Sequence, residues 1–162
     1  MSGDIFLKLN GVEGESKDSK HPNEIQLETV SWGASNAASF NYGGGGGTGK
    51  VTMQDIHFTK VIDKSSSKLF FHCCSGKHFP DATLTFRKAG GEQEEYFQVK
   101  LTDLMVSSIT WSDHAGGGSL AQEQGSLSFT KIEFVYKMQG QDGKLQGQVR
   151  ADWDVKANKG TT

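Results

Sequence analysis

The chain has 162 residues, enough for one domain with a sizeable buried core, although only 35% of them are apolar. Its formal net charge of −2 gives no basic surface of the kind that binds nucleic acid. No apolar run approaches the roughly 20 residues of a membrane helix, and the start of the chain lacks the pattern of a signal peptide. We therefore expect a protein that is made in the cytoplasm, does not insert into membranes, and leaves the cell, if at all, without a cleaved leader.

The first half of the chain predicts short strands joined by turns, in keeping with its 21 glycines and only two prolines. Apolar residues alternate over 5–9 and again at Ile25 and Leu27, which is the period of a strand. Val30 and Trp32 then fall on the opposite parity, which predicts a bulge that bends the strand.

One short helix is expected in the middle of the chain. Either Ser65 or Ser66 can cap its start, and Gly76 suits the position just after its end. Cys73 and Cys74 are the only cysteines, and residues adjacent in sequence rarely bridge. We expect both to be reduced, which agrees with a cytoplasmic origin.

The second half predicts longer strands. Alternating segments over 82–87 and 96–101 flank Gly90-Gly91 and indicate a hairpin. A second change of parity between Phe129 and Ile132 predicts a second bulge, and a last strand follows over 148–155. About eight strands at this spacing are typical of a sandwich or a small closed barrel.

The most unusual segment is rich in glycine. It consists of Ser39, Phe40, Asn41, Tyr42, Gly43, Gly44, Gly45, Gly46, Gly47, Thr48, Gly49 and Lys50. Gly44, Gly49 and Lys50 match most of a phosphate-binding loop. Val51 stands where that loop needs Ser or Thr, and a strand rather than a helix is predicted after it. A mobile or partner-ordered loop is therefore favoured over nucleotide binding.

Other candidate chemistry is weak. His72, Cys73, Cys74 and His78 lack the second ligand pair that a zinc site usually draws from a separate segment. No G-x-S-x-G signature marks a nucleophilic serine. Aromatic residues on a barrel can stack nucleic-acid bases, but the acidic balance opposes this. We expect no catalytic residues, no bound metal and no cofactor.

A series of short segments stands out at 14–18, 31–33, 43–50, 58–60, 63–65, 75–79, 87–91 and 106–108. In this order, from Asp4 to about Trp153, the chain resembles the Hcp family, the tube subunits of bacterial type VI secretion systems.

The resemblance implies a mainly β fold: a compact β-barrel of two curled antiparallel sheets, with one short flanking α-helix and a long Gly-rich loop. One domain would span 1–155, followed by a polar tail over 156–162. Homohexameric rings with a central channel would stack into a tube inside a contractile sheath, beneath a VgrG-type spike. The channel would hold small effector proteins. Contraction would move the tube from the bacterial cytoplasm to the outside or into a target cell.

The resemblance also suggests two sites. Residues 39–50 would contribute to ring stacking or to the interface between subunits. Ser31 would line the channel and contact cargo, the alternative being a plain surface serine. Two other functions stay open: a stand-alone barrel that binds a carbohydrate or a peptide, and a hydrolase with an unrecognised site.

Overall fold

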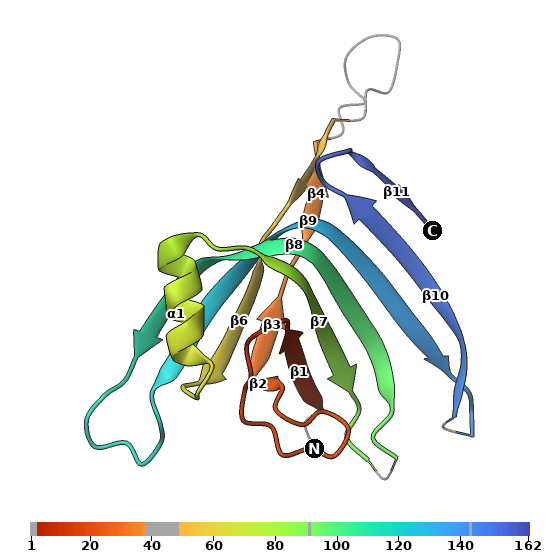
Figure 1. Cartoon of the computed structure of the whole chain (residues 1–162). Coiled ribbons are helices and arrows are strands. Elements are labelled where there is room, and N and C mark those ends of the chain that lie inside the picture. The colour runs from red at the N-terminus through yellow and green to blue at the C-terminus, as the bar shows by residue number, and fades with distance from the viewer. Residues whose placement is uncertain (1–2, 38–48, 91, 143) are drawn as a thin grey trace.

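The computed structural model describes residues 3–37, 49–90, 92–142 and 144–162 (Figure 1). Within these ranges it contains the strands β1 (Asp4–Leu9), β2 (Ile25–Leu27), β3 (Thr29–Ser31), β4 (Ala34–Asn36), β5 (Val51–Met53), β6 (Ile56–Val61), β7 (Phe79–Arg87), β8 (Glu95–Ser112), β9 (Gln122–Gln139), β10 (Leu145–Asp154) and β11 (Lys159–Thr161), and the helix α1 (Ser66–Ser75). The predicted loop residues from Ser39 to Thr48 lie outside the described ranges.

One large antiparallel sheet forms most of the molecule. Its strands follow the order β11-β10-β9-β8-β7-β1-β2, and β6 lies between β9 and β3. Only Glu28 separates β2, which pairs with β1, from β3, which pairs with β6. The sheet therefore curls back on itself, as Figure 1 shows, and β4 and β5 form a small second sheet beside it. This confirms the mainly β fold with two sheets and one short helix.

Two changes of parity bend the sheet. The first lies at Glu28, where the chain passes from β2, paired with β1, to β3, paired with β6. The predicted change of parity is thus a change of partner strand, and the Glu28 backbone amide donates to the Thr59 carbonyl at 2.8 Å. At the second, β8 and β9 keep one register on both sides of Asp103, whose φ is 46°. At this point both strands exchange the side on which their apolar residues lie, and they remain paired in the same register. The change of parity in β9 therefore does not need a bulge of its own. The bulge lies farther along, between Val106 and Ser108 of β8.

The core fills the inside of the curl. Buried Leu, Ile, Phe and Val side chains come from β1, β2, β6, β7, β8 and β9, and α1 adds Leu69, which is fully buried. Each such side chain stabilises the fold by roughly 1.5–3 kcal/mol through removal of apolar surface from water. No helix in the described ranges is both long and apolar enough to span a membrane.

Both ends of the helix follow from the sequence. Gly76 ends α1 with a φ of 66°, a left-handed conformation that glycine adopts without steric cost. Ser65 occupies the N-cap, but its hydroxyl makes no capping bond to the helix. Instead Asp63 accepts from the Ser65 amide at 2.8 Å, and the Ser66 hydroxyl accepts from the Asp63 amide at 3.0 Å.

The C-terminal segment differs from expectation. Residues 156–162, predicted to be a polar tail, turn back after β10 and form β11 against it. The Thr161 hydroxyl donates to the Asp152 carboxylate at 2.6 Å. This hydrogen bond lowers the pKa of Asp152, and nearby Lys131 and Arg150 lower it further.

Candidate functional site

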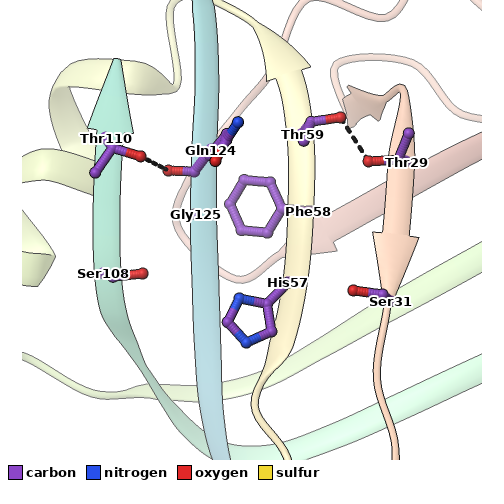
Figure 2. Close-up of a pocket in the computed structure, with 9 residues that line it drawn as sticks. All are labelled: Thr29, Ser31, His57, Phe58, Thr59, Ser108, Thr110, Gln124 and Gly125. Carbon is purple, nitrogen blue, oxygen red and sulfur yellow. Dashed lines mark hydrogen bonds between the residues drawn. The ribbon is translucent and has the colours of Figure 1, made fainter. Parts of the chain in front are cut away.

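Two rows of polar side chains cross four neighbouring strands on the outer surface of the large sheet. Read from β3 through β6 and β9 to β8, the rows are Thr29, Thr59, Gln124 and Thr110, and then Ser31, His57, Ser126 and Ser108. Seven of these eight residues are exposed or half-exposed; they are called the polar face below, and Figure 2 shows them, whereas Ser126 is buried and its hydroxyl contacts that of Ser108. Ser31, the predicted channel residue, lies at one edge of this face.

The period of the strands explains why the polar face exists. Ile56, Phe58 and Lys60 of β6 point into the protein and are buried, so His57 and Thr59 between them must point outward. Gly125 lies opposite Phe58, where a Cβ atom would stand only 2.4 Å from the ring carbon Cζ. Glycine therefore gives the Phe58 ring the space it occupies beneath the face.

The polar face is hollowed and held by its own hydrogen bonds. A shallow depression of about 150 Å³ is lined by residues of all four strands. The Thr29 and Thr59 hydroxyls lie 2.6 Å apart, and the Thr110 hydroxyl donates to the Gln124 carbonyl at 3.5 Å, as Figure 2 shows. Among the described residues that line the depression, His57 is the ionisable one.

This arrangement offers hydroxyl, amide and imidazole groups that can form hydrogen bonds with a partner. Hydroxyl and amide groups at a surface exchange easily between water and a partner, so each bond adds little net affinity. The face therefore suits many weak contacts with a polar surface.

The other residues singled out from the sequence are not brought together. His72 lies 3.4 Å from the Lys77 carbonyl and stacks on Phe79, whereas His78 contacts Asp103 at 2.8 Å. Within the described ranges no cluster of three or more possible metal ligands is found. Gly49 and Lys50, the described end of the predicted interface loop, are exposed beside β5.

Sequence reasoning singled out Ser31 as a channel candidate but none of the other residues of the polar face. Alternation along β6 and β9 predicts which side chains point outward. It does not reveal that these two strands are neighbours, because they are far apart in the chain. Ser126 and Ser108 were not recognisable as neighbours of Ser31 for the same reason.

The fold and the polar face together define a mainly β protein with one short helix and a hydroxyl-rich depression on its large sheet. The family model described as type VI secretion system effector, Hcp, matches residues 6–136. Protein hcp1 of Pseudomonas aeruginosa is 45% identical over 160 residues, which is 98% of each chain. The chain belongs to the Hcp family of the type VI secretion system and is a tube subunit of that system.

Solved structures agree with this assignment. The crystal structure of Hcp1 from Salmonella typhimurium is 35% identical, with a TM-score of 0.82 over 99% of this chain and 100% of that one. A structure described as a type six secretion system protein is 31% identical, with a TM-score of 0.94 over 99% of this chain and 100% of the other. Family and fold thus agree over nearly the whole chain.

Proposed function

We propose that six copies of this chain close into a ring with the polar face turned toward the central channel. The observation that carries this proposal is a hydroxyl-rich surface, whose described lining contains no Asp, Glu, Lys or Arg, bounded by two open strand edges. In the described residues β3 pairs only with β6, and β7 pairs with β8 only as far as Leu104. The remainder of β8 is therefore hydrogen-bonded on one side only.

Open edges at both ends of one surface favour a ring. Unpaired backbone groups at an edge invite pairing with another chain, and a closed arrangement of copies removes both edges at once. The polar faces of successive copies would then join into one continuous lining. Such a lining carries few charges, so it would hold a protein without binding it so tightly that release fails.

The ring predicts a definite mass. Size-exclusion chromatography with light scattering should give about six times the 17.6 kDa of the single chain. A strict monomer at high concentration would contradict the proposal and would favour a stand-alone ligand-binding barrel. The chain would act by assembly rather than by catalysis, so no turnover of generic ester or phosphate substrates is expected.

Ser31 tests the role of the polar face. Gln at this position would extend into the depression and occupy space that a cargo group would otherwise enter, so effectors should co-purify at least tenfold less with Ser31→Gln. Ser19→Gln, at an exposed serine in the loop before β2, is the matched control and should retain cargo. Equal cargo on both variants, measured on intact rings, would show that Ser31 is a plain surface residue.

The wider partners follow from the family. Stacked rings would meet one another partly through residues 39–50, with a contractile sheath around them and a VgrG-type spike at the end. Small effector proteins would occupy the channel. The chain would stay in the bacterial cytoplasm until contraction moves the tube outside or into a target cell.

A further inference from the structure

An apolar groove lies beside α1, away from the polar face. It measures about 440 Å³, and its apolar walls are Ile62, Phe70 and Trp111. The Phe70 and Trp111 rings stand 5.6 Å apart, yet the two residues are 50% and 42% exposed. Large apolar side chains gathered in one exposed patch mark a surface that another molecule covers.

Buried charges hold the groove in shape. Trp111 Nε1 donates to Glu123 Oε2 at 2.8 Å, and Glu123 Oε1 lies 3.2 Å from Lys60 Nζ. Lys60 and Glu123 are both fully buried, and Lys60 also donates to Asp63 at 2.8 Å and to the Ser66 hydroxyl at 3.2 Å. The network joins β6, β8, β9 and the start of α1. The indole is therefore fixed before any partner arrives, which lowers the entropy cost of binding.

A second uncovered apolar surface lies on β9 and β10. Tyr136 pairs with Val149 across these strands, and they are 46% and 59% exposed. Met138, also exposed, extends the surface. Phe134 and Phe97 continue it toward the core, with ring centres 5.7 Å apart. In Figure 1, α1 and β10 lie on opposite sides of the molecule, so the two surfaces do not cover each other within one chain.

We propose that the groove beside α1 in one copy receives the β9–β10 surface of the next copy. The inference rests on the proposed ring and names the two surfaces that meet in it. A patch that pairs with itself closes a dimer and stops, whereas a ring needs two different patches on each subunit. This chain carries two such patches on opposite sides of the molecule, and the proposed ring places another copy beside each of them.

Two variants separate the patches. Phe70→Glu places a charge in the groove, and Val149→Glu places one on the strand surface, at sites exposed enough for the fold to tolerate them. Each variant alone should lose rings by at least tenfold and remain a monomer. An equal mixture should give a heterodimer of about twice 17.6 kDa, because each partner then supplies the one surface that the other lacks.

Phe71→Glu is the matched control. Phe71 is also exposed on α1 but does not line the groove, so this variant should form normal rings.

Circular dichroism must show that all variants are folded. Rings that persist in either groove or strand variant overturn the inference, and so does a mixture that stays monomeric. A wild-type chain that forms no ring overturns the proposed function as well, which distinguishes the two failures.

Discussion

At the scale of single residues, one buried arginine attaches a long loop to the sheet. Arg87 is buried on β7, and its Nη2 donates to Asp4 and to Asp18 at 2.7 Å each. Its guanidinium also lies 4.9 Å from the centre of the Phe6 ring. The hydrogen bond from Arg87 holds the pKa of Asp18 well below its usual range, and the same bond raises the pKa of Arg87.

This contact makes stability sensitive to acid. The pKa of Asp18 is lower in the folded chain than in the unfolded chain, so its contact with Arg87 stabilises the fold at neutral pH. This stabilisation is lost as pH falls below about 4, because Asp18 in the unfolded chain takes up a proton first. Asp18→Asn should reduce the free energy of unfolding at pH 7 by about 1.5–3 kcal/mol, the range for a charged hydrogen bond. Urea unfolding between pH 7 and pH 2 should show a shallower acid loss in the variant. Parallel pH curves for variant and wild type would contradict this.

At the scale of elements, the contact of β6 with β9 depends on the absence of one side chain. Gly125 faces the Phe58 ring, which is 2% exposed and cannot move toward solvent. Close packing of this kind leaves no room for an added methyl group.

The variant Gly125→Ala tests this contact. The added methyl group would overlap the ring, and overpacking typically costs about 1–3 kcal/mol. Thermal unfolding should show the loss. The double variant with Phe58→Leu should lose less than the sum of the two single variants, because the smaller side chain vacates the space. Additive effects would mean that the two residues do not share this contact.

At the scale of the whole molecule, residues 39–50 are proposed to contribute to ring stacking or to the interface between subunits. Residues 39–48 lie outside the described ranges, so their proposed role rests on the sequence and the family. The small β4–β5 sheet, whose two strands come before and after this segment in the sequence, stands toward the top of the molecule in Figure 1.

Removing five glycines tests the loop. Deletion of Gly43 to Gly47 should leave the circular dichroism and thermal unfolding of the chain unchanged, because the core residues lie elsewhere. Tube formation, followed by electron microscopy and sedimentation, should fall at least tenfold.

A deletion in the loop over 13–23 is not a suitable control, since Asp18 in that loop accepts a hydrogen bond from Arg87. Replacing the five glycines with serines keeps the length and should retain more tube than the deletion. Normal tubes in the deleted variant would refute the assignment.

The sequence by itself determined the local elements and the family. Alternation predicted the strands of the Gly90-Gly91 hairpin, Gly76 marked the end of α1, and the short family segments predicted a tube subunit. The tertiary structure alone decided that β6 lies against β9, which brings Ser31 into one surface with Ser108 and buries Lys60 against Glu123. A period of two residues decides the side of a strand on which a residue lies. It carries no information about the neighbouring strand, because that choice depends on packing between segments far apart in the chain.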